Sequence, residues 1–253
     1  MKKMVKAVLA IMSITSLLAL TACGSKDQAA AKKITSYLNS KYNETFVVDA
    51  IGGGYGTLTT NTLKAEVYPE GRPERKFKVE ITKDLSKVWD SYMNVLMTEK
   101  LDVKATELAR EIFQKPVWVK SQVGNFGLSF PDTSLHDKNM SLSDYLQSQR
   151  ADLTIEIYID SGSDIDTSLE TRYVKQFADQ CMTAGMKDGY IDIFYLHTLA
   201  FQNIQQVYVK QENPIKYYQQ DENSYNDTWT QIADGKLQQS ADEITSNFRK
   251  KTR

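Results

Sequence analysis

The sequence predicts an α+β fold with two helix-on-antiparallel-sheet parts packed together. Three observations lead to this prediction. Segments with apolar residues at helical spacing are interspersed with segments in which every second residue is apolar. Alternating segments such as 63–68 and 77–81 follow one another directly, as in an antiparallel sheet with one wet face. The hydrophobic content of 41 %, with 10 % aromatic residues, is that of a chain that folds rather than a disordered one.

The N-terminal part, residues 32–123, is predicted to begin with a helix and continue as strands. Ile34, Leu38 and Tyr42 lie on one face of a helix over about 30–42. A second amphipathic helix should end before Pro116, because the residue that precedes a proline is disfavoured in helical conformation. We expect this second helix at about 101–114 and strands at 46–51, 63–68, 77–81, 88–95 and 117–123.

The C-terminal part, residues 124–253, starts at the best candidate boundary. Segment 124–139 is rich in glycine, asparagine, aspartate and proline, which favour turns. Its predicted order is a short helix that Ser141 caps, a strand at 153–159, a helix at 168–185, strands at 190–196 and 204–209, a loop at 210–234 and a helix at 235–250.

The first 22 residues have the layout of a secretory signal. Three lysines precede an apolar run from residue 7 to residue 20, and small residues then lead to Cys23. The run of about 14 residues is shorter than the roughly 20 that a helix needs to cross a membrane. We therefore expect a signal peptide at 1–22, followed by a small, polar tether at 23–31.

The end of this leader, Leu20-Thr21-Ala22-Cys23, resembles the lipobox of bacterial lipoproteins. The resemblance implies cleavage before Cys23, a diacylglyceryl thioether on its sulfur and, in many bacteria, an acyl chain such as palmitate on the new amino terminus. It implies a protein anchored by lipid to the extracytoplasmic face of the cell membrane. The lysine, asparagine and tyrosine content favours a Gram-positive host.

A second resemblance covers residues 32–95. The helix and strands there, with Phe77-Lys78-Val79-Glu80-Ile81 running through a turn into Lys87-Val88-Trp89-Asp90, are similar to PepSY-like or cystatin-like extracytoplasmic modules. The turn departs from the usual Asp-x-x-x-Gly and reads Lys83-Asp84-Leu85-Ser86. Such modules are mostly regulatory or interaction domains, so the resemblance implies a protein that is not an enzyme.

Charge and cysteine content limit the partners and the means of stabilisation. Residues 1–22 hold three lysines and no acidic residue, so their removal leaves 28 basic and 32 acidic side chains. This acidic balance argues against nucleic acid, which requires a basic surface, and leaves membrane attachment to the lipid on Cys23. Cys181 is then the remaining cysteine, without an intramolecular disulfide partner, and we expect it to be buried on a helix.

The motifs that resemble chemical sites each have a structural interpretation. The glycines of 52–56 lack the Gly-Lys-Ser/Thr of a phosphate loop and suit a hairpin or bulge. Segment 160–166 resembles a calcium loop, but it departs at the third, sixth and twelfth positions and suits a strand-to-helix turn. His136 and His197 have neither the serine elbow of a catalytic triad nor the spacing of a zinc site. We therefore expect no catalytic residue, metal or cofactor, although 32 acidic residues leave a carboxylate pair open.

An aromatic and amide-rich stretch near the C-terminus is the candidate binding surface. Tyrosine and tryptophan give a large contact area at low entropic cost, and amides give adaptable hydrogen bonds. The surface comprises Tyr217, Tyr218, Tyr225 and Trp229, with Tyr208 preceding them. The alternative is that Tyr217 and Tyr218 simply pack a loop onto the domain.

The expected function is therefore non-enzymatic: binding or regulating an envelope protein or a wall saccharide near the membrane. Two alternatives remain open. One is the substrate-binding lipoprotein of a transporter, although such proteins resemble two α/β lobes and the first half lacks the repeated strand–helix pattern. The other is a secreted hydrolase that uses aspartate or glutamate.

Overall fold

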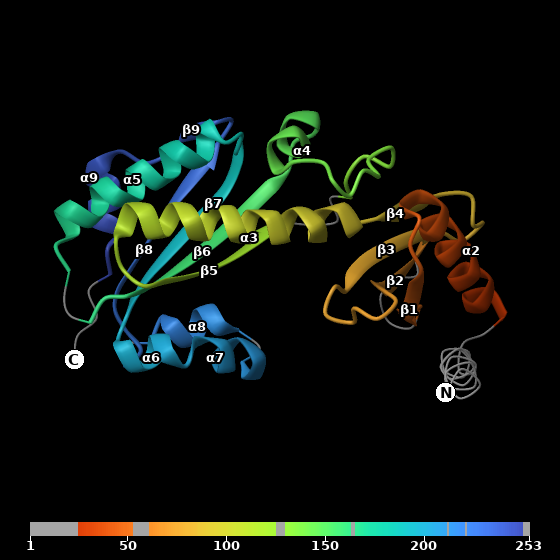
Figure 1. The fold of residues 1–253 in the computed structure, drawn as a ribbon, viewed down its shortest axis with the longest axis horizontal. Helices are drawn as coiled ribbons and strands as arrows, with labels where there is room; N and C mark the ends of the chain where they lie inside the picture. The colour runs from red at the N-terminus through yellow and green to blue at the C-terminus, as the bar shows by residue number, and fades with distance from the viewer. Residues whose placement is uncertain are drawn as a thin grey trace, which may run out of the picture. The chain divides into compact units, whose positions relative to one another are not determined.

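The computed structural model describes residues 25–52, 61–124, 130–162, 165–211, 213–220 and 222–249. These residues form two sheets with flanking helices, so the predicted α+β class is confirmed (Figure 1). Cys23, the signal peptide and the glycines at 53–56 lie outside the described residues. None of the described helices is both long enough and apolar enough to span a bilayer.

Two compact units divide the chain. The first comprises 1–95 and 130–139, and the second comprises 96–129 and 140–253. We expected the division at 123/124, within one turn-rich segment. Segment 130–139 groups with the first unit because Lys138 Nζ lies 3.1 Å from Glu44 Oε2, and the same carboxylate oxygen accepts a hydrogen bond from the Tyr92 hydroxyl.

The first unit is a four-stranded antiparallel sheet with one helix on it. Helix α2 (Ser25–Tyr42) precedes β1 (Phe46–Ile51), β2 (Thr62–Pro69), β3 (Phe77–Thr82) and β4 (Val88–Asp90), which lie in sequence order. The apolar face of α2 buries Ile34, Leu38 and Tyr42, as the helical spacing predicts. Helix α2 begins at Ser25, so 25–31 is helical rather than an extended tether.

A long helix replaces the second half of the predicted fourth strand. Helix α3 (Tyr92–Phe113) begins directly after β4, whereas the sequence pattern predicts a strand up to Val95 and a helix from residue 101. The Asp90 carboxylate accepts a hydrogen bond from the Tyr92 backbone N–H at 3.1 Å, which satisfies one of the free donors of the first turn. Met93 and Met97, four residues apart, are fully buried, and the helical period therefore starts earlier than predicted.

The second unit contains a five-stranded sheet. Its strands, in spatial order, are β5 (Val117–Val123), β6 (Asp152–Asp160), β7 (Asp188–Leu196), β8 (Ser224–Ala233) and β9 (Lys236–Leu237). Strands β6 and β7 are parallel and are joined through helix α5 (Thr167–Thr183), so the sheet is mixed rather than wholly antiparallel. A parallel pair needs such a crossover connection.

Helices lie on both faces of this sheet (Figure 1). On one face α3, α5 and α9 (Ala241–Asn247) cover the apolar residues of β5 to β7, among them Ile155 and Ile193. On the other face α6 (Thr198–Gln202), α7 (Ile204–Lys210) and α8 (Pro214–Tyr218) pack on Tyr158 and Phe194, whose rings stack with centroids 5.0 Å apart. A further helix, α4 (Leu142–Ser148), starts at Ser141, whose side chain accepts from the Asp144 N–H as predicted.

Two predictions for the C-terminal part are wrong. Segment 204–209 is helix α7 rather than a strand, because Ile204 and Val207 are buried at a spacing of three while Val209 is 86 % exposed. Segment 210–234 is not a loop, since it contains helix α8 and strand β8. The final helix is also shorter than predicted, and Leu237 belongs to β9.

Side chains of α3 cover the outer edge of β5. Asp102 Oδ1 accepts the Ser121 backbone N–H at 2.6 Å, and Thr98 Oγ1 accepts the Val123 N–H at 3.0 Å. These two donors point away from β6 and would otherwise be free to pair with another strand.

Candidate functional site

Polar and aromatic side chains form a row across one face of the second sheet. The strand register places Lys120 of β5 opposite Glu156 of β6, Glu156 opposite Asp192 of β7, and Asp192 opposite Trp229 of β8. Directly paired residues of neighbouring strands point to the same face, so these four side chains lie side by side. We call these four residues the carboxylate row.

The carboxylate row lies between two further rows of the same face. One consists of Trp118, Tyr158, Phe194 and Asp227, and the helices α6 to α8 cover its middle. The other consists of Gln122, Thr154, Tyr190 and Gln231. Glu156, Asp192 and Trp229 are partly buried, and Tyr190 is 37 % exposed, so the carboxylate row lies at the margin of the covered area.

Two tyrosines hold Glu156 in place. The Tyr158 hydroxyl donates to Glu156 Oε2 at 2.8 Å, and the Tyr208 hydroxyl, from α7, donates to the same oxygen. The two hydroxyls are also 2.7 Å apart. Burial and the Glu156 charge raise the pKa of both tyrosines, so both remain hydroxyl donors at ordinary pH.

Asp192 has a different environment. Burial, followed by the charges of Glu156 and Asp227, raises its pKa from 3.8 to about 6, while the charge of Arg249 acts in the opposite direction. Within the described part of the chain, no hydrogen bond or ion pair engages its carboxylate. Two neighbouring carboxylates on one sheet face repel each other, so a cation placed between them would relieve this repulsion.

Two cationic side chains in or beside the carboxylate row pair with other carboxylates. Lys120 Nζ lies 3.5 Å from Asp102, and Arg249 Nε lies 3.9 Å from Asp227. The Lys120 and Arg249 side chains are 46 % and 60 % exposed, so solvent screens both cations. The face therefore keeps an excess of negative charge at Glu156 and Asp192.

The structure separates the aromatic residues that the sequence analysis grouped. Trp229 belongs to the carboxylate row, whereas Tyr217 and Tyr218 of α8 lie together with ring centroids 5.1 Å apart. Tyr218 is 0 % exposed and belongs to the core under α6 to α8, which favours the alternative in which these residues pack a segment onto the domain. Tyr225 packs on His197, with ring centroids 3.8 Å apart.

Glu156 and Asp192 were not singled out from the sequence. Each is an acidic residue in the middle of an otherwise apolar alternating strand, Leu-Thr-Ile-Glu-Ile-Tyr-Ile and Tyr-Ile-Asp-Ile-Phe. That placement was the available signal, because burying a charged side chain in the centre of a core strand costs free energy unless the charge is paired or hydrogen-bonded. Their adjacency depends on the parallel register of β6 and β7.

The other motifs behave as structural features where they are described. Asp166 caps α5 by accepting the N–H groups of Ser168 and Leu169, so the acidic turn serves as a helix start. His136 Nδ1 lies 2.7 Å from the carbonyl oxygen of Ser134. Among the described residues, no cluster of histidine, cysteine and acidic side chains could hold a metal ion. Cys181 is buried on α5, and burial raises the pKa of its thiol to about 12.

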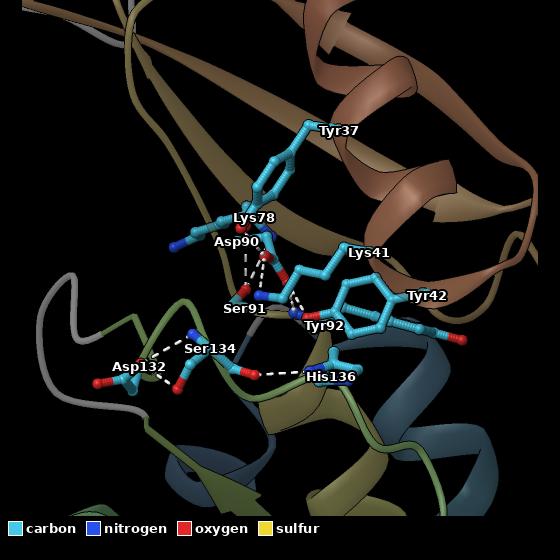
Figure 2. Close-up of polar contacts among 10 residues, drawn as sticks. All are labelled: Tyr37, Lys41, Tyr42, Lys78, Asp90, Ser91, Tyr92, Asp132, Ser134 and His136. Atoms are coloured by element: carbon cyan, nitrogen blue, oxygen red, sulfur yellow. Dashed lines mark hydrogen bonds and ion pairs between the residues drawn. The ribbon is translucent and has the colours of Figure 1, made fainter.

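A second polar cluster, in the first unit, centres on Asp90. Figure 2 shows Tyr37, Lys41 and Tyr42 of α2 converging on this carboxylate at the end of β4. Lys41 Nζ lies 2.8 Å from Oδ2, and the Tyr42 hydroxyl donates to Oδ1 at 2.6 Å. Because Asp90 has several partners and its side chain is 0 % exposed, we interpret this cluster as the attachment of α2 to the sheet.

Comparisons with known proteins assign the chain to no family. No protein-family model and no curated protein matches the chain. A solved structure that is similar is the crystal structure of a DUF5037 family protein from Ruminococcus gnavus, at 14 % sequence identity and a TM-score of 0.48. The similarity covers 85 % of this chain and 97 % of that chain.

Proposed function

We propose that the protein is a non-enzymatic lipoprotein, anchored through Cys23 to the extracytoplasmic face of the cell membrane, that binds or regulates an envelope protein. The lipobox-like Leu20-Thr21-Ala22-Cys23 supports the anchor. The observation that carries the binding role is the carboxylate row, a set of charged and aromatic side chains on a partly open sheet face. The opposite face of β6 and β7 is mainly apolar and covered by helices.

The composition around the carboxylate row supports a protein partner. Trp229 and Tyr190 offer aromatic area, and Gln122 and Gln231 offer amides that can donate and accept. Such a mixture is typical of protein interfaces, whereas a nucleic-acid site requires basic residues. A wall saccharide would also stack on aromatic rings, but it would leave the crosslinking test below without a captured protein.

The anchor is tested by cell fractionation of two cysteine variants. Cys23→Ala should abolish incorporation of radiolabelled palmitate and release the protein from the membrane fraction. Cys181→Ala is the matched control, because it removes the other cysteine and should leave labelling and membrane retention unchanged. Firm membrane retention of Cys23→Ala would contradict the anchor.

The binding role is tested by crosslinking the native lipoprotein in intact cells and identifying the captured proteins by mass spectrometry. One dominant envelope protein is the expected result. Trp229→Ala should reduce its capture, whereas Trp89→Ala, a partly exposed tryptophan of β4 in the other unit, should not. Capture of no protein, or capture that both variants reduce equally, would contradict the proposal.

A carboxylate-dependent hydrolase is the second candidate, and one observation favours it. Glu156 and Asp192 are adjacent, and the pKa of Asp192 is raised to about 6, as in enzymes that use one carboxyl group as acid and another as base. Release of reducing ends from purified wall saccharide, lost in both Glu156→Gln and Asp192→Asn, would favour this candidate over the binding protein.

A further inference from the structure

We propose that the carboxylate row recognises the ammonium group of a lysine side chain on the partner polypeptide, with Glu156 and Asp192 as its acceptors and Trp229 beside them. This inference rests on the proposed binding function and specifies the chemistry of the same site.

Charge complementarity is the first step. Glu156 and Asp192 are direct neighbours in the parallel β6–β7 ladder, and Asp227 lies close enough to act on Asp192. The two cations in or beside the row pair with Asp102 and Asp227 instead. An incoming ammonium group would remove the repulsion between the two carboxylates. Relief of this repulsion, which already exists in the free protein, would contribute to the free energy of binding.

A spare hydrogen-bond acceptor is the second step. Thr154 precedes Glu156 by two residues on β6, so its side chain emerges on the same face beside the carboxylate row. Thr154 is 7 % exposed, and its hydroxyl has no hydrogen-bond partner among the described residues. An ammonium group carries three donors, and Glu156, Asp192 and Thr154 Oγ1 together offer three acceptors.

Tyr190 borders Thr154 on the sheet face. It lies opposite Thr154 in the register and is 37 % exposed, so its ring is available to pack along the aliphatic part of a bound lysine. Lysine stems pack well on apolar surface while the charged end is held elsewhere.

Trp229 is the aromatic neighbour of the Asp192 carboxylate. It lies directly across the β7–β8 ladder from Asp192 and is partly buried. An indole ring next to a carboxylate favours a cation, because the ring face attracts positive charge. The hydroxyls of Tyr158 and Tyr208 both donate hydrogen bonds to Oε2 of Glu156. Its other carboxylate oxygen, Oε1, is therefore available to the ligand.

The test uses the full mature chain and two capped amino acids as probes. Nα-acetyl-lysine N-methylamide carries the ammonium group, and its Nε-acetylated analogue is neutral. Binding is followed by the shift of the Trp229 indole signal in a two-dimensional NMR spectrum, assigned with Trp229→Phe. Affinity for a single side chain is expected in the millimolar range for the charged probe, with no saturable shift for the neutral one.

Matched variants identify the acceptors. Glu156→Gln and Asp192→Asn should each weaken binding of the charged probe by about tenfold, because each removes one charged hydrogen-bond acceptor. Asp179→Asn, an exposed aspartate of α5 with the same change in net charge, should leave the affinity unchanged. Thr154→Val should weaken binding less than either carboxylate variant, because its hydroxyl is a neutral acceptor.

The pH gives an independent readout. The titratable and charged groups that act on Asp192 are Glu156, Asp227 and Arg249, and Lys120 completes the row. Lowering the pH from about 7.5 to about 5 should weaken binding, because Asp192 takes up a proton in that range. In Asp192→Asn this weakening should largely disappear.

Each outcome separates the inference from the proposed function. Equal weakening by Asp179→Asn, or equal shifts from both probes, would overturn the lysine site. An unchanged crosslinked partner in the Glu156→Gln, Asp192→Asn double variant would also overturn it while leaving the binding function intact. Absence of any partner in the wild type would instead remove the proposed function itself.

Discussion

Gly189 occupies a position in β7 that no other residue can occupy without moving the sheet. Its φ of +151° lies in a region that favours glycine, and it pairs with Leu153 of β6 and Ile232 of β8. A Cβ atom at this position would lie 2.0 Å from the Leu153 carbonyl oxygen and 2.7 Å from Met186 Cε. Gly189→Ala should therefore strongly destabilise the second unit.

The magnitude follows from two costs. Holding a non-glycine residue in a sparsely populated backbone region costs about 1–3 kcal/mol. A Cβ atom 2.0 Å from a backbone oxygen cannot persist, so the start of the β6–β7 ladder must open and lose hydrogen bonds worth about 1 kcal/mol each. If two such hydrogen bonds are lost, the total loss is about 3–5 kcal/mol, a large share of the roughly 5–15 kcal/mol that stabilises a typical domain.

The assay isolates the second unit. Trp89 belongs to the first unit, whereas Trp118 and Trp229 belong to the second, so a Trp89→Phe background makes tryptophan fluorescence report on the second unit. Urea unfolding then gives the change in free energy for each variant. Gly235→Ala is the control, because Gly235 has a φ of +68° but no heavy atom within 4 Å of an added Cβ.

Gly235→Ala should cost only about 1 kcal/mol, the price of a left-handed backbone for alanine. If Gly189→Ala were no more destabilising than this control, the close approach to Leu153 would be refuted. The register of β6 and β7 would then also be in doubt, and with it the adjacency of Glu156 and Asp192.

Two further predictions concern buried carboxylates. Asp192→Asn should raise the free energy of unfolding by about 3 kcal/mol near pH 7.5 and leave it unchanged near pH 3.5, as measured by urea unfolding at both values. The sign follows because a folded-state pKa raised to about 6 makes the wild type lose stability as the pH rises from about 4 to 6. If Asp192→Asn instead destabilised the protein at pH 7.5, the ionised Asp192 carboxylate would not be unfavourable in the folded state, and the reasoning would be refuted. Asp90→Ala should cost about 3–5 kcal/mol, because it leaves Lys41 buried without its counter-charge. Asp49→Ala, which removes the exposed partner of Lys76, should cost less than about 1 kcal/mol. Both losses are measured by urea unfolding, and equal losses for Asp90→Ala and Asp49→Ala would refute the expected difference.

Elements with a clear hydrophobic period could be predicted from the sequence. Strands β1, β5 and β6 alternate or run apolar between turns, and the structure places them within a residue of the predicted bounds. The short helix after Ser141 was predictable because its cap is local: one side chain accepts one nearby N–H.

Strand β8 escaped prediction because its buried face is polar. Ser224, Asn226, Thr228 and Thr230 are all at most 2 % exposed, so the strand lacks the apolar alternation that identifies a half-buried strand. Burial of these side chains depends on α9 and on neighbouring strands, since the Thr228 hydroxyl donates to the Ile244 carbonyl oxygen in α9. A local pattern cannot contain that information.

The candidate site escaped prediction for a related reason. Trp229 was singled out by its residue type, but its neighbours in space come from β6 and β7, more than 30 residues earlier. A one-residue change in the register of the parallel pair would send Glu156 and Asp192 to opposite faces. Their proximity is therefore a property of the strand pairing rather than of any segment of sequence.

The covered edge of β5 has a consequence for proteins held close together. Molecules confined to a surface meet one another far more often than molecules in dilute solution, and an open strand edge would then invite them to join into extended sheets. Asp102 and Thr98 occupy two outward N–H groups on one side of the sheet, and β9 offers only two residues on the other. The second unit therefore offers little open edge for edge-to-edge pairing, even where its molecules are crowded.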